Sequence, residues 1–177
     1  ILGVAVRENL RMRDGFFKND EAHQLQIIEM IRKYNPEIVL CNAIDDRHID
    51  HGRGSSLVSD ACFLSGLRRI ETSHNNELQE AWRPKVVYHY IQWKNKEPDF
   101  VVDITGKKKK KVEAIMAYDS QFFNPDTNEP VTPIATKNFL ESINYRAQDL
   151  GRLIGTDFAE GFTVERYLAV NSLTDLI

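Results

Sequence analysis

The sequence predicts an α/β fold in a single domain that covers residues 1–177. Helical patterns alternate with short apolar runs that contain β-branched residues, as the strands of a parallel sheet do. The length suits one core, because domains commonly hold about 100–200 residues. Only two cysteines are present, so the fold does not depend on a disulfide framework, and we expect a cytoplasmic protein.

The first half of the chain is expected to contain a helix, a strand and a second helix. The first helix begins after Asn19 or Asp20, either of which is a good N-cap, and ends before Pro36. Residues 37–41 follow as an apolar strand, which we expect to be buried on both faces. The second helix is expected over residues 52–66, where apolar residues recur on one face.

The second half is expected to contain two strands and two helices. Residues 86–92 and 100–104 are strand-like, and we expect them to pair as neighbours. A helix is expected over residues 107–122, with its first five residues, all lysines, on a solvated face and its later apolar residues in the core. Residues 124–133 are rich in turn residues and indicate a surface excursion or a loop over a site. A last helix is expected over residues 139–151, with its final glycine as the C-cap.

Charge and hydropathy argue against two classes of partner. The 23 Lys and Arg against 26 Asp and Glu give a net charge of −3, which is too mild to indicate a nucleic-acid footprint or a membrane-surface protein. No apolar run approaches the roughly 20 residues that a membrane span needs. We therefore expect neither nucleic acid nor membrane as a partner.

The segment most typical of a functional site is residues 45–52, Asp-Asp-Arg-His-Ile-Asp-His-Gly. It follows the predicted strand that ends at Cys41, and open α/β sheets bind ligands beyond the carboxyl ends of their strands. Neutral imidazole is a common zinc ligand, and a carboxylate beside a second imidazole can hold its tautomer. The alternative is a polar loop whose charges pair with one another and with solvent. A catalytic zinc also needs three protein ligands, which this segment alone does not supply.

The other three histidines do not complete a metal site. His23 lies on the polar face of the first predicted helix, His74 lies in a polar turn, and His89 lies inside a strand-like run. Each is expected to be structural or solvated. The sequence has no Gly-x-Ser-x-Gly elbow and no Gly-rich phosphate loop, and neither cysteine lies next to an obvious base.

Residues 48–51, His-Ile-Asp-His, resemble the His-x-Asp-His motif of the LmbE-like (PIG-L) zinc-dependent N-deacetylases. The wider segment 46–51 looks like the bacillithiol-biosynthesis branch of that family. Residues similar to that branch also occur in the same order at 2–15, 111–121 and 159–162, so the resemblance covers nearly the whole chain. The family commonly has Pro where Ile49 stands, a change that affects the stiffness of the segment more than its chemistry.

The resemblance implies a Rossmann-like three-layer sandwich with a mostly parallel sheet and one zinc ion per chain. It implies a hydrolase that removes acetate from an N-acetylglucosamine conjugate, N-acetylglucosaminyl malate of bacillithiol biosynthesis, and a homo-oligomer, with a hexamer as the suggested size. His51 would bind zinc, His48 would stabilise the oxyanion or protonate the departing amine, and Asp50 would orient His48. Arg47 would hold the sugar or its malate carboxylates, and Lys85 is a weaker candidate for the substrate mouth.

One part of the family pattern does not occur in these residues, an Ala-His-x-Asp-Asp segment near the N-terminus that supplies two zinc ligands and the general-base carboxylate. The chain starts at Ile1 without an initiator Met, so we expect the N-terminal strand, this motif and the remaining zinc ligands upstream of Ile1. Three alternatives stay open. They are a deacetylase of another N-acetylated sugar or amide, a non-catalytic oligomeric relative without the metal, and a nucleotide-binding module suggested only by the α/β pattern.

Overall fold

A computed structural model of the chain describes residues 1–118, 121–122 and 132–176. The chain divides into two compact units. The larger unit comprises residues 9–99 and 162–177, and the smaller unit comprises residues 1–8 and 100–161. The expectation of a single domain stays a prediction.

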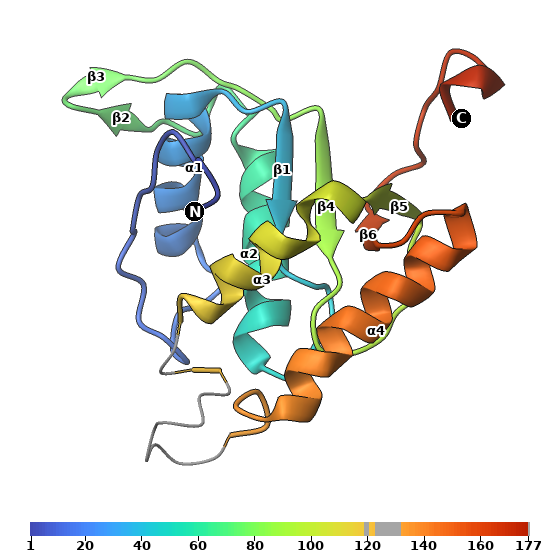
Figure 1. Ribbon diagram of the computed structural model, residues 1–177. Helices are drawn as coiled ribbons and strands as arrows, with labels where there is room; N and C mark the ends of the chain where they lie inside the picture. Colours follow the sequence, from blue (N-terminus) through green and yellow to red (C-terminus); the bar gives the residue numbers. More distant parts are fainter. Residues whose placement is uncertain (119–120, 123–131, 177) are drawn as a thin grey trace. The chain divides into compact units, whose positions relative to one another are not determined.

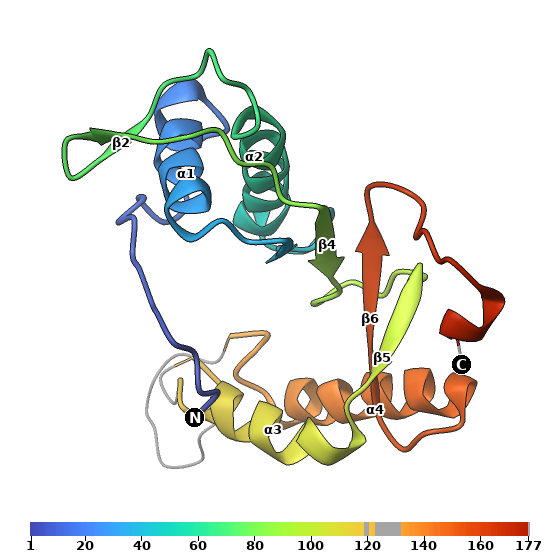
Figure 2. The same cartoon turned by 90° about the horizontal axis from the view of Figure 1, so that it is seen from above.

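The larger unit contains two helices and the strands β1 and β4 (Figure 1). In chain order its elements are α1 (Glu21–Tyr34), β1 (Ile38–Cys41), α2 (Ile49–Leu64), β2 (Ser73–His74), β3 (Glu77–Leu78), β4 (Val86–Tyr90) and the 3-10 helix η2 (Leu173–Leu176). Strands β1 and β4 are parallel, and β2 pairs with β3 as an antiparallel hairpin that the sequence pattern did not predict. Helices α1 and α2 lie side by side (Figure 2).

Helix α1 has the boundaries that the sequence predicts. The side chain of Asp20 caps its first turn by accepting a hydrogen bond from the His23 backbone N–H at 3.1 Å. At the other end, Asn35 takes a left-handed conformation (φ 47°) and its N–H bonds to the Ile31 carbonyl. Asparagine tolerates that conformation better than most residues, so the helix ends before Pro36 as expected.

The core of the larger unit forms where α1 and α2 meet. Its buried members are Ile28, Ile31, Ala61 and Cys62, and Val39 of β1 packs against them. Strand β1, however, is not buried on both faces as predicted. Ile38 and Leu40 are each 57% exposed. Side chains alternate along a strand, so the helices of this unit cover only the face that carries Val39 and Cys41.

A buried arginine joins α1 to the segment that follows α2. Arg32 is 5% exposed, and its guanidinium donates to four oxygen atoms at 2.7 to 3.0 Å. The acceptors are the carbonyls of Ser65, Leu67 and Ile70 and the hydroxyl of Thr72. Burial lowers the pKa of Arg32 below its ordinary value. Because the guanidinium presents several donors in one plane, it bonds all three carbonyls of this segment at once. Two of them also accept backbone N–H groups, Ser65 from Trp82 and Leu67 from Ile70.

The smaller unit contains β5 (Phe100–Asp103), the 3-10 helix η1 (Thr105–Lys107), α3 (Lys108–Met116), α4 (Lys137–Ile154) and the first half of β6 (Ala159–Val164). Helix α3 confirms the predicted lysine-rich helix over a shorter range. Its apolar residues do not enter the core as expected, since no residue of α3 is buried. Lys109 and Lys110 are exposed, Lys108 and Lys111 are half-buried, and Lys111 forms an ion pair with Glu160.

Helix α4 runs past its predicted C-cap. Gly151 lies inside the helix, and the cap is Gly155 in the left-handed conformation (φ 75°). A Cβ atom at Gly151 would lie 2.7 Å from both the Phe158 nitrogen and the Thr156 oxygen. Gly151 is therefore required by the close approach of the returning backbone, not by the helix end.

The strand order of the mixed sheet is β1-β4-β6-β5. β4 pairs with β6 in antiparallel fashion, with His89 opposite Thr163. The predicted neighbours β4 and β5 are therefore separated by β6, and that prediction was wrong. The expected mostly parallel Rossmann-like sheet is correct only at the coarser level of an α/β fold, since the sheet combines parallel and antiparallel pairs.

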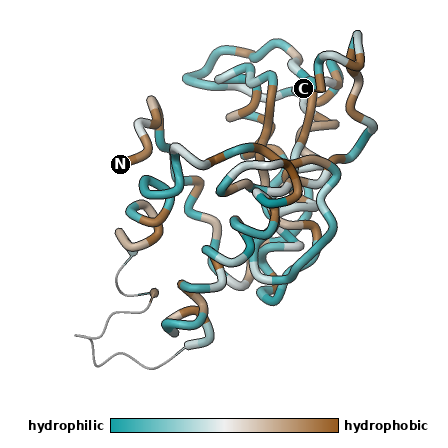
Figure 3. The backbone as a smooth tube through the Cα atoms, turned by 45° about the vertical axis from the view of Figure 1, so that its right-hand side comes forward, coloured by the Kyte–Doolittle hydropathy of each residue, from teal (hydrophilic) through white to brown (hydrophobic). Residues whose placement is uncertain are grey.

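Hydrophobic stretches are short and alternate with hydrophilic ones along the backbone (Figure 3). Within the described residues, no helix is long and apolar enough to cross a bilayer. Most of the turn-rich segment expected at 124–133 lies outside the described residues, so its interpretation as a surface excursion or a loop over a site stays a prediction.

We predict that Arg32→Lys destabilises the protein by about 2–4 kcal/mol, because a lysine cannot reach all four acceptors and so loses several charge-assisted hydrogen bonds of a buried side chain. Urea unfolding at neutral pH measures the change. Arg68→Lys, which makes the same chemical change at an exposed position, is the control and is expected to stay within about 0.5 kcal/mol of wild type. Equal midpoints for the two variants would contradict this account of Arg32.

Candidate functional site

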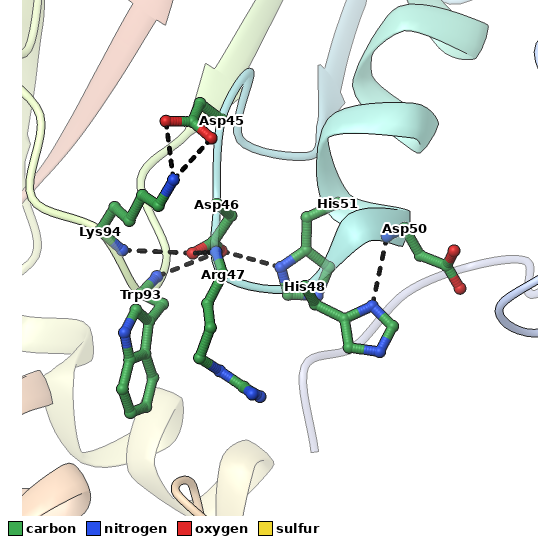
Figure 4. Close-up of polar contacts among 8 residues, drawn as sticks. All are labelled: Asp45, Asp46, Arg47, His48, Asp50, His51, Trp93 and Lys94. Atoms are coloured by element: carbon green, nitrogen blue, oxygen red, sulfur yellow. Dashed lines mark hydrogen bonds and ion pairs between the residues drawn. The ribbon is translucent and has the colours of Figure 1, made fainter.

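The predicted site segment lies at the carboxyl end of β1, where the chain turns into α2 (Figure 4). Helix α2 starts three residues earlier than expected, at Ile49, with His48 as its N-cap. The Nδ1 atom of His48 accepts the backbone N–H of Asp50 at 3.2 Å. Asp50 and His51 therefore belong to the first turn of a helix and not to a loop, which fixes their relative directions.

Asp46 is the centre of the hydrogen bonds in this segment. Its side chain is 0% exposed. It accepts a hydrogen bond from His51 Nδ1 at 2.8 Å and three more from backbone N–H groups. The backbone donors are Arg47 at 2.7 Å and Trp93 and Lys94 at 3.2 Å each. One carboxylate thus binds the segment after β1 to the segment after β4.

These contacts also set the charge of Asp46. Burial by itself raises the pKa of this carboxyl, but the hydrogen bonds from His51 and from the three backbone groups outweigh it. The pKa of Asp46 therefore lies below its ordinary value of 3.8. Asp46 is a carboxylate at neutral pH, and every one of its partners donates to it.

The contact with Asp46 determines which nitrogen of His51 is available. A carboxylate only accepts, so the proton of a neutral His51 lies on Nδ1 and the lone pair lies on Nε2. The His51 side chain is 31% exposed. A carboxylate that holds Nδ1–H in this way is the usual companion of a histidine whose other nitrogen binds a metal ion.

His48 has the opposite tautomer. Its Nδ1 accepts the helix-capping N–H, so a neutral His48 carries its proton on Nε2 and can donate it to a ligand. The centroids of the His48 and His51 rings lie 5.4 Å apart. The first turn of α2 therefore presents a hydrogen-bond donor and a lone pair close to each other.

The structure gives the carboxylate of Asp50 other partners than His48. It accepts from the Gly15 N–H at 2.6 Å and from Arg53 at 2.9 Å. In the described contacts, Asp50 meets the His48 ring through its backbone N–H and not through its carboxylate. Asp50 thus ties the residues before α1 to the start of α2, and its expected action on His48 stays a prediction.

Arg47 and Trp93 lie together at the site. The Arg47 guanidinium carbon is 5.1 Å from the centroid of the Trp93 ring, a cation–π contact that holds the side chain while leaving its N–H donors to other partners. Arg47 is exposed. Beside it, Lys94 Nζ binds both oxygens of Asp45 at 2.8 and 2.9 Å. Arg47 is therefore placed where it can meet an anionic ligand.

Lys85 does not lie with the other candidates. It directly precedes β4, and its Nζ binds Glu37 at 2.7 Å. Glu37 directly precedes β1, which runs parallel to β4. Both residues thus lie at the amino ends of the strands, whereas residues 46–51 follow the carboxyl end of β1. The structure brings together Arg47, His48, Asp50 and His51 and leaves Lys85 at the opposite end.

The residues present fit one position of a zinc site. His51 has the tautomer and the carboxylate partner that a zinc ligand needs. The described part of the chain holds no cluster of three or more His, Cys, Asp or Glu residues arranged for a metal ion. A catalytic zinc takes three protein ligands, so His51 can be one of them but does not form the site alone.

Sequence reasoning did not assign a role to Asp46. Its type and its distance of five residues from His51 were visible, but the same was true of Asp45 and Asp50 nearby. The contribution of Trp93 and Lys94 could not be read from the sequence, because it comes from their backbone N–H groups. Any non-proline residue could supply those donors.

No protein-family model matches the chain. Three solved structures are similar to it. The conserved protein TT1542 from Thermus thermophilus is 27% identical, with a TM-score of 0.80 over 96% of this chain and 70% of that chain. The N,N'-diacetylchitobiose deacetylase from Pyrococcus horikoshii, solved with its inhibitor MPG, is 25% identical, with a TM-score of 0.65 over 94% and 60%.

The third is GalB, the 4-carboxy-2-hydroxymuconate hydratase from Pseudomonas putida KT2440, which is 19% identical with a TM-score of 0.63 over 87% of this chain and 62% of that chain. At that identity the likeness shows the fold alone. The chain thus spans about three fifths of the length of the deacetylase and of the hydratase. Together the matches support an α/β fold of the LmbE-like (PIG-L) type and a distant structural relationship to a sugar N-deacetylase.

We predict that Asp46→Asn costs about 1–3 kcal/mol of stability at pH 6, because an amide cannot accept from all four donors. The pKa of Asp46 is lower in the folded state than in the unfolded state, so its contribution is complete above pH 3.8 and is lost as the pH falls through the lowered pKa. The difference in urea midpoint between wild type and Asp46→Asn should therefore be larger at pH 6 than at pH 3.

Asp45→Asn is the matched control for this experiment. Asp45 is exposed and binds only the side chain of Lys94 in the described contacts, so its replacement is expected to change stability by about 0.5 kcal/mol or less. A gap between wild type and Asp46→Asn that stays the same or widens at pH 3 would show that the carboxylate is not the group responsible.

Proposed function

We propose that this chain is part of a zinc-dependent hydrolase that removes the acetyl group from an N-acetylated amino sugar. The observation that carries the proposal is the pair of imidazoles at the start of α2. Asp46 holds His51 with its Nε2 lone pair available, and the capping N–H of Asp50 holds His48 as an Nε2–H donor. The likeness to a diacetylchitobiose deacetylase supports the same class of substrate.

The two histidines suit different steps of amide hydrolysis. His51 would be one ligand of the zinc ion, which when bound lowers the pKa of water and polarises a carbonyl group. His48 Nε2–H would donate to the oxygen that becomes negative when the acetamide carbon turns tetrahedral. Asp46 would keep His51 in the ligating tautomer throughout. The remaining zinc ligands are not assigned to the described residues.

Arg47 supports a substrate that carries a carboxylate. A guanidinium binds a carboxylate through two parallel hydrogen bonds, and the Arg47 side chain is exposed and held at Trp93. This favours a malate conjugate such as N-acetylglucosaminyl malate, the substrate expected from the resemblance to the bacillithiol-biosynthesis branch. The second candidate is an N-acetylated sugar without a carboxylate, such as the diacetylchitobiose named for the Pyrococcus horikoshii protein.

Acetate release from three compounds tests the proposal. Purified protein is incubated with zinc and N-acetylglucosaminyl malate, diacetylchitobiose or N-acetylglucosamine, and free acetate is measured. The malate conjugate is expected to have the highest kcat/KM, and Arg47→Ala is expected to reduce that preference by about 10-fold or more, the value of about one charge-assisted contact. Acetate release from none of the compounds would contradict the proposed activity.

The two histidines are expected to respond differently to truncation. His51→Ala should lose zinc at a protein concentration at which wild type retains it, since it removes a ligand. His48→Ala should keep zinc and lose about 100- to 1,000-fold in kcat, the usual cost of an oxyanion donor. Zinc is measured by elemental analysis after gel filtration, and kcat by acetate release.

His74→Ala is the control for both variants, because His74 pairs with Glu29 at 2.7 Å outside the site. It should change neither the zinc content nor kcat. Full zinc occupancy in His51→Ala, or loss of zinc in His48→Ala, would overturn the assignment of the two roles.

A further inference from the structure

Another histidine of the larger unit, His89, is buried in strand β4. It occupies β4 opposite Cys41 of β1 and is 2% exposed. Its Nδ1 atom is 2.9 Å from the Asn42 carbonyl oxygen, 2.9 Å from Ser55 Oγ and 3.2 Å from Cys41 Sγ. Its Nε2 atom is 2.9 Å from Glu165 Oε1.

The partners of His89 determine where its protons lie. The Asn42 carbonyl can only accept, so the 2.9 Å contact requires a hydrogen on Nδ1. The Ser55 hydroxyl oxygen can accept the same hydrogen as a second acceptor, so its contact agrees with a protonated Nδ1. The contact between Nε2 and Glu165 also needs a hydrogen, since a lone pair and a carboxylate oxygen would repel each other at 2.9 Å. One proton therefore lies on Nδ1 and a second lies between Nε2 and Oε1.

Glu165 is the group that can balance this second proton. Its side chain is 38% exposed and so remains in contact with water. The two buried cysteines nearby do not compete, because burial raises the pKa of Cys41 and of Cys62 to about 12 and keeps both as neutral thiols. The negative charge of the Glu165 carboxylate thus offsets the positive charge of a doubly protonated His89.

The place of His89 in the fold links this pair to the site. Asn42 is the first residue after β1 and starts the segment that carries Asp46 and His48. Its side-chain oxygen lies so close to α2 that a Cβ at Gly54 would be 3.1 Å from it. Ser55 lies one helical turn after His51 on α2. His89 therefore contacts the chain on both sides of the two imidazoles, at Asn42 before His48 and at Ser55 after His51.

We propose that His89 is a positioning residue, whose Nδ1–H fixes the Asn42 carbonyl and whose second proton is shared with Glu165. Through Asn42 and Ser55 it holds the start of the segment and helix α2 at a constant separation, so that Asp46 keeps its contact with His51. The expected effect of His89 on catalysis rests on the proposed function. The positions of its protons, and its role in fixing the segment from Asn42 to α2, do not.

Ring-nitrogen NMR of the uniformly 15N-labelled protein tests the proton positions. In wild type at neutral pH, both His89 nitrogens are expected at shifts typical of protonated nitrogen. Glu165→Gln offers an amide donor to Nε2, so Nε2 should move to the unprotonated range while Nδ1 stays protonated. An unprotonated Nδ1 in wild type, or an Nε2 shift that Glu165→Gln does not change, would overturn the assignment.

Amide exchange tests the holding of the segment. The N–H groups of Arg47, Trp93 and Lys94 report on it, because all three donate to Asp46. His89→Phe keeps a planar aromatic ring at this position and removes the hydrogen bonds, and it should accelerate the exchange of these three N–H groups about 10-fold or more. His74→Phe, the same change in the histidine that pairs with Glu29, should leave these rates within about 3-fold of wild type.

A wild-type measurement covers the case in which His89→Phe does not fold. If His89 and the segment open together, the His89 Nδ1 proton and the Arg47 amide share one opening free energy and one denaturant dependence. Opening equilibrium constants of the His89 Nδ1 proton and the Arg47 amide that differ by about 10-fold or more would contradict the proposal. Wild-type exchange rates in a folded His89→Phe variant would contradict it as well.

The activity assay separates this inference from the proposed function. With N-acetylglucosaminyl malate as substrate, His89→Phe should lower kcat about 10-fold while KM stays within about 3-fold of wild type. The residues that contact the substrate are retained, but His48 and His51 are no longer held in their relative positions. Glu165→Gln keeps Nδ1–H and should retain most of the wild-type kcat. If wild type releases no acetate, the proposed function fails, and the NMR and exchange results still decide the role of His89.

Discussion

The buried carboxylate of Asp46 is the constraint on which the site depends. Its side chain has no exposed surface, and it collects donors from the start of α2 and from the segment after β4. A carboxylate removed from water is costly unless hydrogen bonds replace its hydration, so these two segments must stay together for the carboxylate to remain charged. The parallel pairing of β1 and β4 makes this possible, because it brings the carboxyl ends of both strands to one edge of the sheet.

The parts of the fold that follow from local sequence could be predicted, and the parts that follow from distant pairing could not. Helix α1 was predicted closely because its cap, its period and Pro36 all lie within one stretch. Helix α2 was predicted too short because its cap is a histidine, whereas Ser, Thr, Asp and Asn are the usual N-caps. The position of β6 between β4 and β5 depends on contacts far apart in the chain, which no local pattern contains.

The same division applies to the site. Residue types that can bind a metal or a carboxylate were visible in the segment 45–52, and the structure groups Arg47, His48 and His51 there. Their hydrogen-bond partners were not visible. Asp46 and Asp50 are equally acidic in the sequence, and only the fold shows that Asp46 contacts a ring nitrogen while the Asp50 carboxylate contacts Gly15 and Arg53. Lys85 lies apart from this group because it precedes β4, which runs parallel to β1. The direction of that strand cannot be known from composition.

The contact between Arg47 and Trp93 gives the protein an intrinsic optical probe. The chain has two tryptophans, and the indole N–H of Trp82 is bound to the Pro36 carbonyl at 2.8 Å, at the end of the strands away from the site. Of these two rings, only that of Trp93 has a guanidinium over it among the contacts of the described residues. A bound anion that draws Arg47 away changes the electric field at that indole and leaves Trp82 as an internal reference. The fluorescence of the unlabelled protein therefore contains a signal from the place where a ligand carboxylate would dock.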